Sequence, residues 1–375
     1  MRFRQGVAAA LAVATSLGAA STAHAARGME IGLQDDAVFL YQSYYNRDVA
    51  LQQARQLGVT RLRVNVLWDR IAPFQNAQRS VPRPVIYNWA PYDHLVDAAS
   101  ASGIKVQMTV AGPAPAWANG KHRPGLHQGA YKPNPRLYGR FIHDVALHFK
   151  GRVDRYSVWN EPNWPGWLAP YKTAPRQYAR LFRAGYSGVK RADRHAQVLF
   201  GELAPQQRRG KSLAPLTFLR RVTRHHRFKA DGLAHHPYAF TVSPKSKRGG
   251  PGDVTMGTLR RLTHLLHKLA RKHRLRTSHG RPLPVYLTEY GYFARGPRSL
   301  GERRRAAYLR KGFKMALRNR AVREMTQYTL VAPPGNELWD TSLLTQGGAP
   351  TRTFNALSRW TLGAVRAGRV AAKPR

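Results

Sequence analysis

Two kinds of segment alternate along the chain. Short apolar or β-branched runs, typical of buried strands, recur eight times and are separated by longer stretches with helical periodicity. The runs span residues 31–33, 61–67, 105–110, 155–159, 197–201, 232–235, 285–288 and 327–331. The helical stretches span 47–57, 92–102, 134–149, 175–192, 213–225, 255–273, 301–320 and 353–365.

This alternation predicts βαβ units, an α/β fold and a parallel sheet. Eight such units in one chain favour a single (β/α)8 TIM barrel, and an open, doubly wound sheet is the alternative. No Pro/Ser-rich linker separates a second domain. We therefore expect one catalytic domain over residues 26–365, followed by a basic flexible tail over 366–375.

The N-terminus has the pattern of a secretory signal peptide. Arg2 and Arg4 precede a mostly apolar run over 7–20, and Ala23-His24-Ala25 reads as a cleavage site. We expect residues 1–25 to be removed from a secreted, extracellular protein; an apolar core helix or a retained anchor is the alternative. The run is too short for a transmembrane segment, and no later stretch is long enough.

Composition narrows the classes further. The 375 residues contain no cysteine, which excludes disulfides, thiolate metal sites and a cysteine nucleophile. Lys and Arg number 62 against 19 Asp and Glu, a net charge of +43. The basic residues are spread over nearly every helix and no nucleic-acid-binding module is present, so we expect no specific nucleic-acid partner. We expect a monomer that is nonspecifically attracted to an anionic cell wall or matrix.

In a TIM barrel, functional groups gather at the carboxyl ends of the strands. The chain has seven glutamates, and two of them, Glu161 and Glu289, follow the fourth and seventh runs. Carboxylates facing each other there can act as an acid and as a base or nucleophile in glycosidic cleavage. Arg63, from the second run, can keep the nucleophile ionised. The alternative is that both glutamates only pair with the many arginines.

Four short motifs support glycosidic cleavage over simple pairing of the glutamates with arginines. Residues 158–163 (VWNEPN) contain an Asn-Glu-Pro signature, and 287–291 (LTEYG) contain the second glutamate. Arg63 lies in an Arg-x-Asn-x-x-Trp segment, and His236-Pro237-Tyr238 follows the sixth run. Together they resemble the motifs of the clan-A retaining glycoside hydrolases, the superfamily of cellulases, β-mannanases, β-xylosidases and β-galactosidases, in the manner of families 5 and 39.

The resemblance implies a retaining β-glycoside hydrolase that cleaves O-glycosidic bonds of a polysaccharide or oligosaccharide by double displacement. It implies that Glu161 is the general acid/base and Glu289 the nucleophile, about 5–5.5 Å apart. Asn160 would bind the sugar 2-hydroxyl. Arg63 and Tyr238 would orient Glu289, with His236 beside them at the substrate.

Tryptophans near the strand ends are candidate platforms for sugar rings. They are Trp68, Trp117, Trp164, Trp167 and Trp339, and each of them has a core position as its alternative. Trp159 is expected to pack beneath the site. Clan members often carry an aromatic platform on strand eight, whereas here the nearest tryptophan, Trp339, lies in the following loop.

The remaining polar candidates have mostly structural explanations. Glu202 is expected to form a salt bridge with an arginine, with substrate contact as the alternative, and Asp35 and Asp36 either bind a sugar hydroxyl or cap a loop. No metal-ligand spacing accompanies the histidine pairs, so we expect neither a metal nor a cofactor. The basic amphipathic stretch 255–276 fits an outer barrel helix. The competing function is a catalytically inactive barrel that binds polysaccharide or cell wall.

Overall fold

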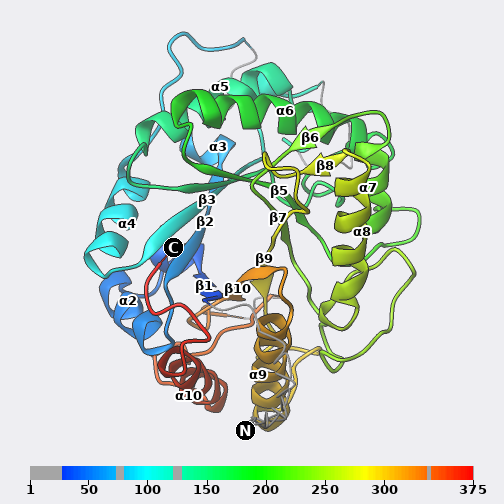
Figure 1. Ribbon diagram of the computed structural model, residues 1–375. Helices are drawn as coiled ribbons and strands as arrows, with labels where there is room; N and C mark the ends of the chain where they lie inside the picture. The colour runs from blue at the N-terminus through cyan, green and yellow to red at the C-terminus, as the bar shows by residue number, and fades with distance from the viewer. Residues whose placement is uncertain (1–27, 73–79, 121–128, 336–338, 375) are drawn as a thin grey trace, which may run out of the picture.

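The computed structural model describes residues 28–72, 80–120, 129–335 and 339–374. Its centre is a closed barrel of eight parallel strands (Figure 1), joined in the order β1-β10-β9-β7-β5-β4-β3-β2. The strands are β1 (Glu30–Gln34), β2 (Arg61–Leu67), β3 (Lys105–Ala111), β4 (Arg155–Val158), β5 (Gln197–Leu203), β7 (Gly232–His235), β9 (Val285–Tyr290) and β10 (Val322–Tyr328). The predicted TIM barrel is confirmed.

Helices form a ring around this barrel (Figure 1). The longer ones agree with the predicted stretches to within a few residues: α2 (Arg47–Gln56), α4 (Ala90–Ala101), α5 (Pro135–His148), α6 (Ala174–Ala192), α7 (Pro215–Thr223), α8 (Leu259–Arg271), α9 (Glu302–Arg318) and α10 (Arg352–Arg366). Short turns of helix are α1 (Asp36–Phe39), α3 (Trp68–Ile71), η2 (Ala116–Ala118) and η3 (Met256–Thr258). A pair of two-residue strands, β6 (Phe228–Lys229) and β8 (Leu275–Arg276), lies outside the barrel.

The prediction for the eighth strand is wrong in position. It was expected at 327–331, but β10 begins at Val322 and ends at Tyr328. The cause is Glu324, a charged residue that breaks the apolar pattern although it is fully buried inside the barrel. Pairing with β1 places Glu324 beside Glu30, so the carboxylates of two neighbouring strands meet.

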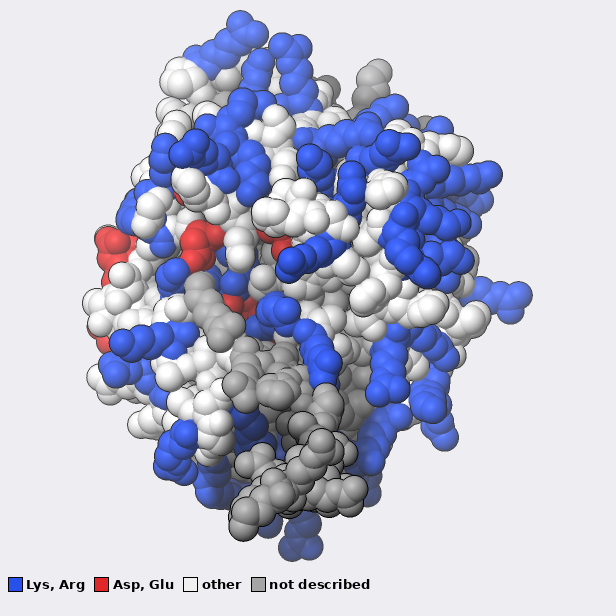
Figure 2. Space-filling model, in the orientation of Figure 1, with Lys and Arg blue, Asp and Glu red and all other residues white. Residues whose placement is uncertain are grey.

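The outer helices are amphipathic, with apolar side chains against the barrel and basic side chains toward solvent. In α8 the leucines at 259, 262, 265, 266 and 269 are buried against the barrel. On α9, Arg303, Arg304, Arg310 and Lys314 are exposed. Figure 2 shows Lys and Arg over most of the visible face, with Asp and Glu confined to a few places.

A buried ion cluster fills the amino-terminal end of the barrel. Arg155 Nη1 lies 2.8 Å from Glu30 and 2.7 Å from Glu324, and Arg61 lies 3.1 Å from Glu30. The Arg155 guanidinium also lies 4.6 Å from the ring centroid of Tyr286. Because these side chains are almost fully buried, each charge depends on its partners. The cluster ties β1, β2, β4 and β10 together.

The ends of the chain need one correction. The expected flexible tail from 366 on is packed in part, since Val370 is buried and bridges with Met29, just before β1. The predicted signal peptide, residues 1–25, lies outside the described residues. No helix in the described part of the chain is both long and apolar enough to cross a membrane.

Replacing Arg155 tests the ion cluster. We expect Arg155→Ala to lower the free energy of unfolding by about 3–5 kcal/mol, because it leaves the carboxylates of Glu30 and Glu324 buried without their shared partner. Urea denaturation measures the loss. Arg152→Ala is the matched control: this residue pairs with Asp93 and Asp97 at the surface, and its loss is expected to stay below about 1 kcal/mol. Equal losses in both variants would contradict the structural role of the cluster.

Candidate active site

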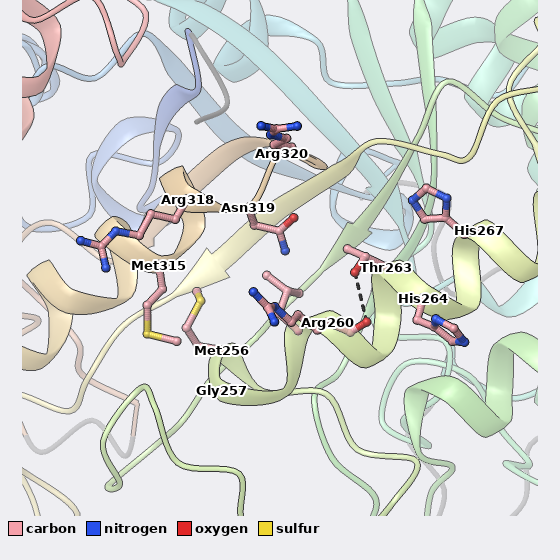
Figure 3. A pocket seen from close by; sticks show the side chains of 11 residues that line it. Met256, Gly257, Arg260, Thr263, His264, His267, Met315, Arg318, Asn319 and Arg320 are labelled. Carbon is pink, nitrogen blue, oxygen red and sulfur yellow. Dashed lines mark hydrogen bonds between the residues drawn. The ribbon is translucent and has the colours of Figure 1, made fainter. Parts of the chain in front are cut away.

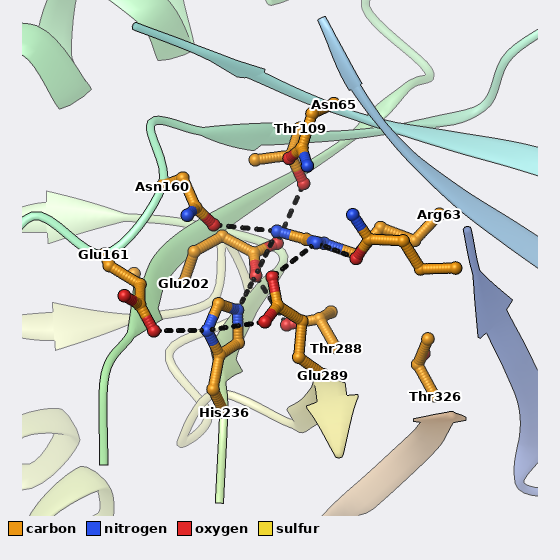
Figure 4. Close-up of polar contacts among 12 residues, drawn as sticks. Arg63, Asn65, Thr109, Asn160, Glu161, Glu202, His236, Thr288, Glu289 and Thr326 are labelled. Carbon is orange, nitrogen blue, oxygen red and sulfur yellow. Dashed lines mark hydrogen bonds and ion pairs between the residues drawn. The ribbon is translucent and has the colours of Figure 1, made fainter. Parts of the chain in front are cut away.

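The residues of the four motifs come together at the carboxyl end of the barrel (Figure 4). Arg63 projects from β2 and Glu289 from β9, while Asn160 and Glu161 follow β4 directly. His236 follows β7. Parallel strands bring these positions to one edge although they lie more than two hundred residues apart in sequence.

The backbone after β4 is held in an uncommon conformation. Trp159 and Glu161 have positive φ angles of 67° and 36°, a region that costs a non-glycine residue about 1–3 kcal/mol. Three contacts hold Trp159 there: its backbone N–H donates to Val110 O at 3.0 Å and to the Tyr138 hydroxyl at 3.2 Å, and its indole N–H donates to Trp167 O at 2.8 Å. After this turn, Asn160 points toward Arg63 and Glu161 points toward His236 (Figure 4).

An irregularity in β5 places a third carboxylate in the same region. The pairing of β5 with β7 shifts register between Gly201 and Leu203, and Glu202 has a φ of 55°. Such bulges re-aim a side chain. Glu202 is fully buried, and it accepts hydrogen bonds from Thr288 Oγ1 at 2.5 Å and from Thr109 Oγ1 at 3.2 Å.

The Arg63 guanidinium is the common partner of these groups. Its Nη1 donates to Glu289 Oε1 at 2.8 Å, and its Nη2 donates to Asn160 Oδ1 at 2.8 Å and lies 3.3 Å from Glu202. It also donates to Gln34 at the end of β1. The predicted salt bridge of Glu202 to an arginine is confirmed.

His236 joins the three carboxylates. Its Nε2 lies 2.8 Å from Glu202, and its Nδ1 lies 2.9 Å from Glu161 Oε1 and 3.6 Å from Glu289 Oε2. Since both of these oxygens lie so near one nitrogen, they are at most about 6.5 Å apart. This bound is compatible with the spacing of about 5–5.5 Å between the carboxyl groups of retaining glycosidases.

Burial and neighbouring charges shift the pKa values of the glutamates, the histidine and the arginine of the site in different directions. Burial raises the pKa of Glu161, and the His236 imidazole opposes that rise in part. Burial also favours the neutral form of Glu202, but Arg63 and His236 outweigh it and lower that pKa to about 2. Burial would lower the pKa of His236, yet Glu289, Glu161 and Glu202 raise it to about 9. Arg63 is likewise held charged, since Glu202 and Glu289 raise its pKa against the effect of burial.

Two further side chains complete the contacts of Glu289 and Arg63. The Tyr238 hydroxyl donates to Glu289 Oε2 at 3.1 Å, so this carboxylate is held by a phenol and a guanidinium together. Asn160 accepts from Arg63 through its oxygen, which fixes the orientation of the amide and turns its NH2 group away from the arginine (Figure 4).

A cavity of about 440 Å³ opens beside Glu161. Trp164 and Trp339 line it from the loops after β4 and β10, with Tyr238 and Phe240 between them in the chain. Trp339 is 39% exposed and packs edge-on against Tyr238 at 5.4 Å. These two tryptophans are therefore placed where a sugar ring can stack.

Two of the tryptophans predicted as sugar platforms lie elsewhere. Trp68 is fully buried and stacks on Phe141 at 4.9 Å, and Trp117 is buried edge-on against it at 5.5 Å, so both belong to the core. His236 and Arg63 do lie at the site, where both are buried and contact the carboxylates. The expected contact of Arg63 with Glu289 is present. Trp159 is buried beneath the site, as predicted.

The two aspartates after β1 have separate roles. Asp35 caps α1 and accepts the backbone N–H groups of Leu330 and Val331 at 2.9 and 3.2 Å, so it is structural. Asp36 is partly exposed, accepts from the Asn65 amide at 2.8 Å, and has its pKa raised to about 6 by burial.

Sequence reasoning missed the polar residues that support Glu202 and Arg63. Gln34, Thr109 and Thr288 lie inside strands and hydrogen-bond to these charges. Their signal was a polar residue in an otherwise apolar run close to the carboxyl end of a strand.

A second hollow lies on the outside of the molecule. It has a volume of about 690 Å³ and lies between α8 and the end of α9 (Figure 3). Its lining includes Arg260, His264, His267 and Arg318, with no carboxylate. Within the described residues, no group of three or more His, Asp or Glu side chains is arranged to hold a metal ion. We assign this hollow no chemistry.

Comparison with known proteins finds similarity in three-dimensional structure but not in sequence. No family model matches the chain, and no curated protein matches it in sequence. Solved structures do match. A family 39 glycoside hydrolase from Bacteroides cellulosilyticus WH2 has a TM-score of 0.63 at 19% identity, over 89% of this chain and 64% of that one.

Two further structures agree. A family 39 β-xylosidase from Caulobacter crescentus has a TM-score of 0.58 at 18% identity, over 90% of this chain and 71% of that one. Xylanase 10B from Thermotoga petrophila RKU-1 has a TM-score of 0.58 at 16% identity, over 90% of this chain and 95% of that one.

The chain has the fold of the clan-A glycoside hydrolases. The likeness predicted from the four motifs is thus confirmed for the architecture, at low sequence identity. The chain spans less than two thirds of the Bacteroides enzyme. Because a barrel of this kind serves many chemistries, activity has to be argued from the site itself.

The charge of His236 is open to a stability test. Its pKa of about 9 in the folded protein exceeds the ordinary 6.5. Its stabilising effect is therefore complete below pH 6.5 and is lost as the pH rises through 9. We expect His236→Gln to cost on the order of 3 kcal/mol more at pH 6 than at pH 10. Urea unfolding of both proteins at the two pH values measures this. A cost independent of pH would mean that His236 is neutral.

Proposed function

We propose that the protein is a retaining β-glycoside hydrolase, with Glu161 as general acid/base and Glu289 as nucleophile. The observation that carries this proposal is the meeting of both carboxylates at one nitrogen, His236 Nδ1, at the mouth of the barrel. The fold shared with glycosidases of several families supports it. The substrate follows as a carbohydrate with a β-linkage.

In the first step the two carboxyls act on opposite sides of one bond. Glu289 Oε2 attacks the anomeric carbon as the bond to the glycosidic oxygen breaks, and protonated Glu161 gives its proton to that oxygen. Arg63 and Tyr238 hold Glu289 through two hydrogen bonds, one to each carboxylate oxygen, which keeps it aligned for attack. The raised pKa of Glu161 keeps the proton in place until the leaving group requires it.

The second step reverses these roles. Glu161, now ionised, takes a proton from water, and the water oxygen attacks the anomeric carbon of the glycosyl ester. The bond to Glu289 breaks and its carboxylate is released. The NH2 group of Asn160, turned away from Arg63, is placed to donate to the sugar 2-hydroxyl, a bond that strengthens as positive charge develops on the ring.

Glu202 is a second candidate partner for Glu289, and its surroundings favour a supporting role. It has no exposed surface, whereas the Glu161 side chain is 20% exposed and lines the cavity. A pKa of about 2 also leaves Glu202 without the proton that an acid must supply. We propose that Glu202 keeps His236 and Arg63 charged and in place.

Variants at the three glutamates test this assignment on a panel of chromogenic β-glycosides. We expect Glu289→Ala to lower kcat by roughly 10⁴-fold or more. Glu161→Ala is expected to lose about 10²–10⁴-fold on substrates with poor leaving groups and much less on activated aryl glycosides. Azide in place of water identifies each role: Glu161→Ala yields the β-glycosyl azide, and Glu289→Ala yields the α-glycosyl azide.

Glu202→Ala is the matched control and yields no azide product under the proposal. Azide rescue of Glu202→Ala, and not of Glu161→Ala, would transfer the acid/base role to Glu202. If the wild-type protein hydrolyses no glycoside of the panel and no natural glycan, the proposed activity is contradicted. The alternative function is then an inactive barrel that binds polysaccharide or cell wall.

We also propose that the enzyme is secreted, on the basis of the signal pattern in residues 1–25. Cleavage after Ala25 predicts a mature protein that begins at Ala26. Mass spectrometry of the N-terminal peptide of protein collected outside the cells measures this. A protein that stays in the cells with Met1 retained would contradict secretion.

A further inference from the structure

Two arginines line the cavity beside Glu161. Arg208 lies in the loop after β5 and Arg298 in the loop after β9, so they come from separate parts of the chain. Each guanidinium lies over an aromatic ring: Arg208 is 4.8 Å from the centroid of Trp164, and Arg298 is 4.1 Å from that of Phe293 and 5.6 Å from that of Trp339. Both arginines are exposed at the rim.

Contact with these rings favours the presence of both guanidinium groups at the rim of the cavity. A guanidinium has its N–H donors in one plane, in a geometry that matches a carboxylate, sulfate or phosphate group. Among the described residues that line the cavity, Glu161 is the one carboxylate.

The cavity lies on the leaving-group side of the reaction. Glu161 lines it, and neither Glu289 nor Arg63 does. Because the acid protonates the oxygen that departs, the part of the substrate beyond that oxygen lies next to the acid. The cavity is therefore the place for the sugar that is released, and not for the sugar that becomes attached to Glu289.

We propose that this cavity binds an anionic sugar, one that carries a carboxylate, sulfate or phosphate group, as the leaving group of the glycosidase reaction. This rests on the proposed function and names its substrate class. Gln206 and Thr241, which also line the cavity, offer polar groups for the sugar hydroxyls, and the two arginines meet the anionic substituent.

Binding measurements on the wild-type protein test the proposal directly. Methyl β-glucoside is the neutral probe, and methyl β-glucuronide, glucose 6-sulfate and glucose 6-phosphate are the anionic ones. NMR titration gives each Kd at low and at high salt. We expect at least one anionic probe to bind roughly fivefold or more tightly than the glucoside at low salt. That advantage should shrink as salt rises. The anion that binds best identifies the substituent.

Matched variants separate this site from the charge of the whole protein. Arg208→Ala combined with Arg298→Ala is expected to remove the preference to within about twofold, because both cations are lost. Arg209→Ala combined with Arg303→Ala removes the same charge from residues that do not line the cavity, and is expected to keep the preference. The proposal is overturned by equal Kd values for all probes, by no binding of any probe, or by equal loss in both double variants.

An assay of hydrolysis distinguishes failure of the anionic-sugar proposal from failure of the proposed function. Chromogenic β-glycosides carry an uncharged aryl leaving group, so wild-type hydrolysis of them needs no anion. Hydrolysis without any preference for the anionic probes overturns this inference alone. Absence of hydrolysis of every glycoside overturns the proposed function, whichever probe binds.

Discussion

The mouth of the barrel depends on one buried guanidinium. Arg63 reaches groups from β1, from the turn after β4, from β5 and from β9. Carboxylates buried this close to one another would repel, and each would be costly to remove from water. With Arg63 among them, Glu202 and Glu289 stay in place, and Asn160 is oriented by the same contact. The strained turn at Glu161 brings this side chain to His236, which is itself held by Glu202, a partner of Arg63.

Much of the fold and the site follows from sequence because both depend on local patterns. The period of apolar residues identifies seven strands and the long helices, and the parallel order brings their carboxyl ends together. Glu161 and Glu289 stand out because glutamate is rare in this basic chain. Asn160, which follows β4 directly, and Arg63, which lies within β2, could be found by the motifs around them.

Other features depend on which groups meet across the barrel, which a single sequence does not show. Glu324 breaks the apolar pattern of β10 because it is charged, and its burial depends on Arg155, which comes from another strand. Trp68 follows a strand like a sugar platform, yet its ring turns outward against Phe141. His236 shows no sign in the sequence that its two nitrogens serve different carboxylates.

The bridge made by His236 has a consequence for charge balance. Two cations, Arg63 and His236, stand among three carboxyl groups, so the set is neutral when one carboxyl carries no charge. Under the proposed mechanism, that one is protonated Glu161 before reaction and the ester of Glu289 in the glycosyl-enzyme, when Glu161 is ionised. The total charge is then the same in both states, so the proposed reaction needs no counter-ion to enter or leave between its two steps.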